Sequence, residues 1–157
     1  MAAYEGISLT CELGEDLPLV EADRIALARV IANLLSNAIK FTPEGGKIIL
    51  ACQQIKNGDA QRLIIPAYCK MPEWLYAKRC LMRFSVKNSG DEIPPEELAD
   101  IFGRFIQGQK LQGRKQEGAG LGLAYCKLAI ESMGGVIWAE SITGSGSEFI
   151  MLLPCCQ

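Results

Sequence analysis

Three polar residues have the types and spacing of a site for a phosphate-bound metal ion: Asn33, Asn37 and Lys40. They lie at i, i+4 and i+7, so a helix places them on one side. An amide oxygen is a hard ligand that suits Mg²⁺, and the Lys ammonium is a point charge that suits phosphate. Two ordinary asparagines on a solvated stripe give the same pattern, so the spacing alone leaves both interpretations open.

A second candidate is the glycine-rich run at residues 118–123, which reads Gly-Ala-Gly-Leu-Gly-Leu and precedes an apolar stretch. Glycine lets the backbone approach a phosphate closely, and the free N–H groups at a helix start favour an anion. The spacing differs from that of the dinucleotide fingerprint and of the P-loop. A flexible hinge before a helix is the alternative interpretation.

The third candidate is the turn that follows an apolar strand at residues 87–94, where Asn88 precedes Gly90. A polar side chain at a strand end, next to a glycine, is able to reach the edge of a flat ligand. Taken alone, this segment is an ordinary turn.

The predicted elements decide whether these segments meet. Asp23 is a good N-cap, and apolar spacing predicts a helix from 24 to about 41. Strands are expected at 7–13, 47–55, 81–87, 136–140 and 147–153, a short helix opening at 94–97, and a longer helix at 119–133. Residues 56–80 are expected to form an elaborated hairpin connection with packed aromatics. This order predicts an α+β fold with one domain over 1–157, a two-layer α/β sandwich with helices on one face of a mixed β-sheet.

Charge and histidine content exclude several classes of function. There are 16 Lys and Arg against 18 Asp and Glu, a net charge of −2, which argues against binding nucleic acid through overall charge. The chain has no histidine, so it completes no His-based catalysis, His metal site or phosphorelay by itself.

Seven cysteines, an odd number without a C-x-x-C pair, favour free thiols in a reducing compartment over a disulfide framework. No signal peptide or apolar span of about 18 residues is visible. We therefore expect a cytoplasmic chain without membrane contact of its own, whose parent protein can still be membrane-anchored.

Together and in this order, the motifs resemble the ATP-binding catalytic domain of sensor histidine kinases. This group lies in the ATPase superfamily that also contains gyrase, Hsp90 and MutL. Residues 33–42 resemble its asparagine box, 101–105 its phenylalanine box, 118–123 its second glycine box, and 138–141 with 144–149 its terminal hairpin. The resemblance covers nearly the whole chain and implies the Bergerat-type ATP-binding fold.

The resemblance implies ATP and Mg²⁺ as cofactors. By it, Asn37 would coordinate the metal, with Asn33 and Lys40 as catalytic residues near the phosphates. Gly118, Gly120 and Gly122 would shape the phosphate-side wall. The other nucleotide-binding positions that it implies are Asn88, Gly90, Ile93, Phe105, Leu121 and Ser147.

The resemblance also implies an ATP lid at about 103–117, with Phe102 and Phe105 packed at its base. Lys110, Arg114 and Lys115 in this lid are candidate phosphate contacts. Solvated basic residues in a loop are the alternative interpretation.

Two departures affect the adenine end. The family has an Asp that accepts a hydrogen bond from the adenine amino group, and here that position is Asn88. A charge-assisted bond is roughly twice as strong as a neutral one, so about 1 kcal/mol, near fivefold in affinity, is at stake. Glu92 stands where the family has a second glycine and adds bulk and charge at the pocket edge. We expect weaker nucleotide binding than in a standard kinase domain.

A third departure concerns the reaction. Relatives that hydrolyse ATP have a water-activating Glu four residues before the metal-binding Asn, and Asn33 holds that place here. An amide is a poor general base. The chain is therefore unlike a gyrase- or Hsp90-type ATPase and fits transfer to a protein side chain.

The resemblance implies a protein histidine kinase catalytic domain in two-component signalling. It would donate the γ-phosphate to a histidine on a separate, dimeric, helical phosphoacceptor domain of the parent protein, with a response regulator downstream and no nucleic acid. The alternative is a degenerate nucleotide-binding or structural module without kinase activity, for which Asn88 and Glu92 are the evidence. An anti-sigma or serine-kinase relative is a third interpretation, against which Asn33 counts.

Overall fold

The computed structural model describes residues 6–56, 59, 62–78, 80–103 and 122–156. In chain order, the elements of this part are β1 (Ser8–Leu13), α1 (Arg24–Phe41), β2 (Lys47–Lys56), α2 (Glu73–Tyr76), β3 (Cys80–Asn88), α3 (Gly122–Ser132), β4 (Val136–Ile142) and β5 (Gly146–Pro154).

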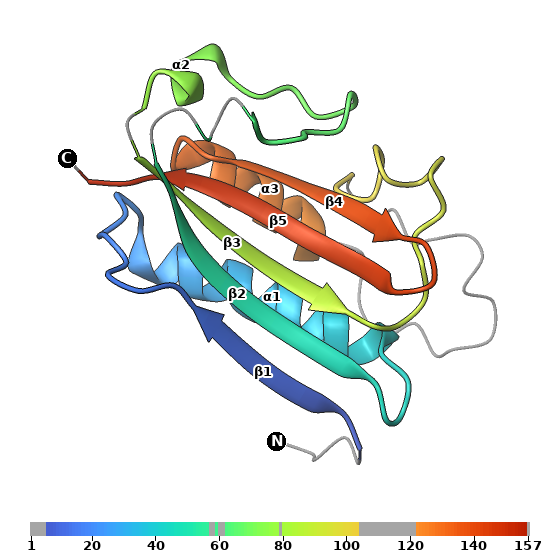
Figure 1. Ribbon diagram of the computed structural model, residues 1–157. Helices are drawn as coiled ribbons and strands as arrows, with labels where there is room; N and C mark the ends of the chain where they lie inside the picture. Colours follow the sequence, from blue (N-terminus) through green and yellow to red (C-terminus); the bar gives the residue numbers. More distant parts are fainter. Residues whose placement is uncertain (1–5, 57–58, 60–61, 79, 104–121, 157) are drawn as a thin grey trace.

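The strands form one mixed sheet in the order β1-β2-β3-β5-β4. β3 is therefore the central strand. β1 runs parallel to β2, and the other neighbouring pairs are antiparallel. Figure 1 shows α1 and α3 side by side behind this sheet. The predicted α+β fold, a mixed sheet with helices packed on one face, is confirmed.

Helix α1 has the predicted bounds because its signals are local. Asp23 Oδ1 accepts the backbone N–H of Ala26 at 2.8 Å, which satisfies one of the donors left free at a helix start. Val30, Leu34 and Ala38 are buried at the expected spacing. No helix within the described ranges is both long and apolar enough to span a bilayer.

The main core lies between these helices and the sheet. Leu34 of α1 and Ile130 of α3 pack with Val86 of β3 and Phe149 of β5. Phe102 joins this core, with its ring edge-on to that of Phe149 and 6.1 Å between the ring centroids. Phe102, expected to pack at the base of the lid, is thus buried in this core, and the lid beyond residue 103 lies outside the described residues.

The predicted short helix opening at 94–97 is wrong. The segment forms successive turns, in which the N–H of Glu97 bonds to the Pro94 carbonyl at 2.9 Å and that of Asp100 to the Glu97 carbonyl at 3.0 Å. The Ile101 N–H also bonds to the Glu97 carbonyl at 3.1 Å, which is the spacing of one helical bond. A helix needs successive bonds of this kind, and the described residues 94–103 do not form them.

Residues 62–78 pack a second core on the sheet face opposite α1 and α3. Ile137 and Ala139 of β4 point into the main core, so their neighbour Trp138 faces the other way. There Trp138 packs with Leu75 of α2, which is fully buried. The predicted hairpin connection therefore also covers part of the second face of the sheet.

The same segment covers the outer edge of β4. The Tyr68 hydroxyl donates a hydrogen bond to the carbonyl of Ala139. Beyond the edge, the Trp74 ring lies against Gly134, where an added Cβ would be 2.9 Å from it. An unprotected edge strand is a template for pairing with other chains, and this wrapping blunts that edge.

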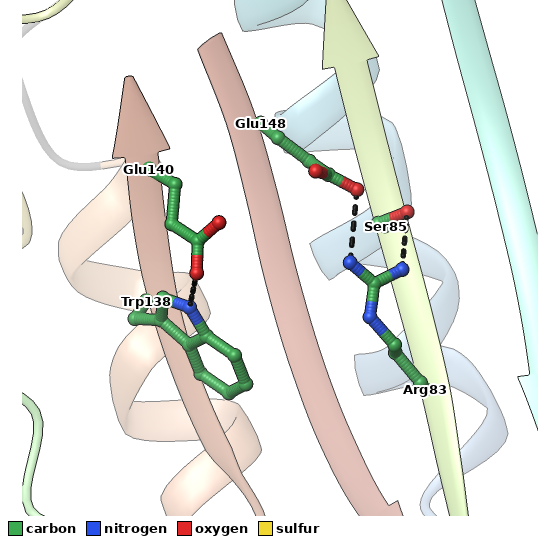
Figure 2. A network of polar contacts seen from close by, with 5 residues as sticks. All are labelled: Arg83, Ser85, Trp138, Glu140 and Glu148. Atoms are coloured by element: carbon green, nitrogen blue, oxygen red, sulfur yellow. Dashed lines mark hydrogen bonds and ion pairs between the residues drawn. The ribbon is translucent and has the colours of Figure 1, made fainter. Parts of the chain in front are cut away.

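Polar side chains line another part of the same sheet face (Figure 2). Arg83 bonds to the Glu148 carboxylate and to the Ser85 hydroxyl, both at 3.0 Å, and the Trp138 indole donates to Glu140 at 2.9 Å. The Arg83 and Glu148 side chains are only 18% and 16% exposed. These bonds satisfy the partly buried charges across β3 and β5.

The expectation that all cysteines are free thiols is wrong for two of them. Cys80 and Cys155 form a disulfide with Cα atoms 5.5 Å apart. They are 75 residues apart in sequence, but antiparallel pairing of β3 with β5 places Leu81 opposite Pro154 and so brings them together. Among the described residues, Cys11, Cys52, Cys69, Cys126 and Cys156 are free.

The second core makes a testable contribution to stability. Leu75→Ala should lower the free energy of unfolding by about 2–5 kcal/mol, because it leaves a cavity in a fully buried cluster. The matched control is Ile64→Ala in the same segment, whose side chain is 89% exposed and whose loss should cost below about 0.5 kcal/mol. Urea denaturation measures both, and equal small effects would mean that residues 62–78 do not pack on the sheet.

Candidate functional site

The described part of the candidate site is built from α1, the first turn of α3, the end of β3 and the start of β5. It contains eight of the predicted site residues: Asn33, Asn37, Lys40, Asn88, Gly90, Ile93, Gly122 and Ser147. The predictions for Phe105, Gly118, Gly120, Leu121, Lys110, Arg114 and Lys115, and for the lid beyond residue 103, lie outside the described residues.

Asn33 faces the first turn of α3. A Cβ added at Gly122 would lie 3.8 Å from Asn33 Cγ and 3.9 Å from its Oδ1. One turn further along α3, burial raises the pKa of the Cys126 thiol to about 11, and a hydrogen bond with the Asn33 side chain acts in the opposite direction. The first asparagine of α1 and the last glycine of the glycine-rich run, far apart in sequence, therefore lie next to each other.

Asn37 and Lys40 continue the same side of α1 toward its C-terminal end. Asn37 is half-buried and Lys40 is exposed, with its Nζ 5.5 Å from the centre of the Phe41 ring. An α-helix has about 3.6 residues per turn, so the row from Asn33 to Lys40 covers roughly two turns of α1. The predicted polar row of Asn33, Asn37 and Lys40 thus lies on one side of the C-terminal half of α1.

The donor set fits a metal that arrives on a phosphate and not one held by the protein alone. Among the described residues, no group of three or more His, Cys, Asp and Glu side chains gathers to hold a metal ion. Mg²⁺ usually keeps several waters and is bound through one or two protein oxygens plus substrate phosphates. The amide oxygen of Asn37 is a hard donor of the kind that such a site would use.

At the other end of the site, Asn88 and Ser147 form a buried pair. The two residues are direct partners in the register of β3 and β5 and are only 3% and 4% exposed. Ser147 Oγ donates to Asn88 Oδ1 at 2.7 Å. The sequence singled out both residues but gave no sign of the bond between them.

At two positions near Asn88, neighbouring backbone segments approach so closely that only glycine fits. A Cβ at Gly90 would lie 2.0 Å from the carbonyl oxygen of Phe41, the last residue of α1. Gly146 has a φ of +96°, and a Cβ there would lie 2.0 Å from the carbonyl oxygen of Asn88. Gly90 thus packs the end of β3 against α1, and Gly146, which sequence reasoning did not single out, packs it against β5.

The turn after Asn88 is tied to its neighbours on both sides. Ser89 exchanges hydrogen bonds with Lys47 of β2, at 2.8 Å to its Oγ and 3.0 Å from its backbone N–H. On the other side, the Ile93 N–H donates to Ser141 Oγ at 3.1 Å, and Glu92 accepts the N–H of Gly144. The Glu92 carboxylate, expected to add charge at the pocket edge, therefore also holds the β4–β5 turn.

The family described as "Histidine kinase-, DNA gyrase B-, and HSP90-like ATPase" matches residues 22–157. The alginate biosynthesis sensor protein KinB of Pseudomonas aeruginosa is 39% identical over 148 residues, which are 94% of this chain and 20% of that protein. The sensor histidine kinase WalK of Bacillus subtilis is 33% identical over 135 residues, 86% of this chain and 19% of that protein. The chain thus spans about a fifth of the length of these relatives.

Solved structures of histidine kinases are also similar to this chain. The catalytic domain of histidine kinase ThkA superposes with a TM-score of 0.68 at 33% identity, over 95% of this chain and 79% of that one. Full-length ShkA in complex with AMPPNP gives 0.70 at 28% identity, over 96% of this chain and 26% of that one. ThkA in complex with the response regulator protein TrrA gives 0.64 at 32% identity, over 96% and 34%.

The contribution of the buried Asn88–Ser147 hydrogen bond to the free energy of unfolding should be measurable in the protein without a ligand. Ser147→Ala should lower the free energy of unfolding by about 1–3 kcal/mol, because the buried Asn88 oxygen loses its partner. Ser145→Ala, an exposed position in the same hairpin, is the control and should change stability by less than about 0.5 kcal/mol. If thermal and urea unfolding do not separate the two variants, the bond contributes nothing.

Proposed function

Because this chain belongs to the histidine kinase-, DNA gyrase B- and HSP90-like ATPase family, as a histidine kinase catalytic domain, we propose that it binds ATP with Mg²⁺ and donates the γ-phosphate to a histidine on another domain. The observation that carries this proposal is the approach of Asn33 on α1 to Gly122 at the start of α3. This approach places the row of Asn33, Asn37 and Lys40 next to the N-terminal end of α3, a helix of 11 residues.

The phosphate end would lie along this junction. The first N–H groups of a helix have no partner within the helix, so they and the positive end of its dipole favour an anion. Asn33 would contact the phosphates there, and Lys40 would offset their charge from the exposed end of α1. Asn37 would supply an oxygen ligand to Mg²⁺, which when bound neutralises charge on the transferring phosphoryl group.

The residues of this site favour transfer over hydrolysis. Asn33 is not a base, so it does not activate a water molecule for attack. A histidine side chain is itself a nucleophile, so the protein has to position it and the phosphate and to balance charge. The chain contains no histidine, so the acceptor must come from outside this sequence.

We propose that the acceptor lies on a dimeric helical domain of the parent protein, which functions on the cytoplasmic side, and that a response regulator receives the phosphate. The complex of the relative ThkA with its response regulator supports this order of partners. The net charge of −2 gives no support for a nucleic-acid partner.

The alternative function is a nucleotide-binding module that does not transfer phosphate. The observation that favours it is Asn88, a neutral residue at the base end whose oxygen already accepts from Ser147. Weak ATP binding would leave the domain empty or structural at low nucleotide concentration. Phosphotransfer assays separate this alternative from the kinase.

Transfer should be reconstituted in trans. With γ-labelled ATP, Mg²⁺ and a purified acceptor domain from the parent protein or a relative, acid-labile phosphohistidine should form, and EDTA should abolish it. Asn37→Ala should slow formation by about 10- to 100-fold through loss of a metal ligand. Ser36→Ala, at the neighbouring exposed position of α1, is the control and should leave the rate unchanged. ATP binding without any label transfer would support the alternative.

The affinity for ATP should depend on the charge at position 88. Asn88→Asp should tighten ATP binding about fivefold, because a carboxylate keeps one oxygen for Ser147 and offers the other to the adenine amino group. Isothermal titration calorimetry with Mg²⁺ measures the change. Unaltered or weaker binding would remove position 88 from the nucleotide site.

A further inference from the structure

The Asn88 side chain has one group left for a ligand, and this group is a hydrogen-bond donor. Its Oδ1 already accepts from Ser147 Oγ at 2.7 Å. Its amide nitrogen donates to no residue in the described part of the chain. Every buried side-chain polar atom of those residues has a partner, so this nitrogen must open to accessible space.

Gly90 provides the space beside this nitrogen. A Cβ at position 90 would lie 2.9 Å from Asn88 Nδ2, so any larger residue would press on the amide. The rest of the Asn88 side chain is enclosed, since the residue is only 3% exposed. The small accessible part of the residue therefore presents an N–H₂ group, at the end of the site opposite Asn33 and Gly122.

This donor matches one class of purine better than another. Adenine has an amino group at C6, which is itself a donor, so an N–H₂ group directed at C6 forms no bond with it and has to reach the neighbouring ring nitrogen N1 instead. Inosine and guanosine have a carbonyl oxygen at C6, which accepts from Nδ2. A carboxylate only accepts, so an acidic residue at this position selects the amino group, whereas an amide in this orientation selects the carbonyl.

Rotation of the amide restores adenine binding only at a cost. Turning Asn88 by 180° would offer Oδ1 to the base and place Nδ2 against Ser147 Oγ. The Ser147 hydroxyl would then accept, and its own hydrogen would lose its buried acceptor, since Ser147 is 4% exposed. The bond between Ser147 and Asn88 therefore holds the amide in the donor orientation.

We propose that Asn88, fixed by Ser147, makes the base end of this site take a 6-oxopurine nucleoside triphosphate at least as tightly as ATP. The inference rests on the proposed nucleotide-binding function and specifies its substrate class. Asn88 acts here as a specificity-determining residue, because it reads the atom at C6 of the base.

Inosine triphosphate is the sharpest probe, because it lacks the additional 2-amino group of guanosine triphosphate. Titration calorimetry of the chain with Mg²⁺ should give a Kd for inosine triphosphate no higher than the Kd for ATP. Asn88→Asp should reverse the order and favour ATP by about tenfold, since the carboxylate repels the C6 oxygen and accepts from the amino group. Asn37→Ala, at the other end of the site, should weaken both nucleotides by the same factor.

The outcomes separate this inference from the function on which it rests. A wild-type preference for ATP above about twofold, or a ratio that Asn88→Asp shifts no more than Asn37→Ala does, overturns the base selectivity and leaves the nucleotide site standing. If the folded chain, checked by circular dichroism, binds neither nucleotide, both the selectivity and the proposed function fail.

Discussion

The end of β3 passes between α1 and β5 with no room for a side chain on either side, and the rest of the site depends on this contact. Gly90 lies against the last carbonyl of α1, and Gly146 lies against the carbonyl of Asn88. Any Cβ at either position would overlap backbone atoms, which cannot move as a flexible side chain can. The central strand, the asparagine-bearing helix and the terminal hairpin are therefore held at fixed relative positions.

That contact relates the two ends of the candidate site to each other. α1 is anchored at its C-terminal end against Gly90 and, near its middle, approaches α3 through Asn33. The helix thus runs from the anion-favouring start of α3 toward the Asn88–Ser147 pair. A ligand with a charged end and a flat polar end fits such an arrangement. Residues 62–78 and the Arg83–Glu148 pair act on the opposite face, where they keep the sheet covered and paired.

The features that the sequence predicted well depend on neighbours in the chain. The bounds of α1 follow from Asp23 and from apolar spacing, and both signals lie within the helix or directly before it. The features that it missed depend on residues far apart. Nothing near Glu92 indicates that its carboxylate meets Gly144, and nothing near Cys80 indicates that Cys155 lies beside it. At 94–97, Pro and acidic residues matched a helix start, but a single bond of helical spacing, from the Ile101 N–H to the Glu97 carbonyl, followed in the described residues, and the segment forms turns. Residues 62–78 were placed correctly in the order of elements, yet only the alternation of β4 shows which sheet face they cover.

The loop that the Cys80–Cys155 disulfide closes contains only part of the candidate site. The loop that it closes contains Asn88, Gly122 and Ser147, whereas α1, with Asn33 and Asn37, precedes it. A cross-link that closes a loop of this size removes roughly 4 kcal/mol of chain entropy from the unfolded state in the simplest model. Only the wall of the candidate site that carries the Asn88–Ser147 pair and the start of α3 receives this restraint directly. Helix α1, which forms the opposite wall, lies outside the cross-linked loop and is held in place by packing and hydrogen bonds. Reduction of the disulfide would therefore loosen one wall of the site more than the other.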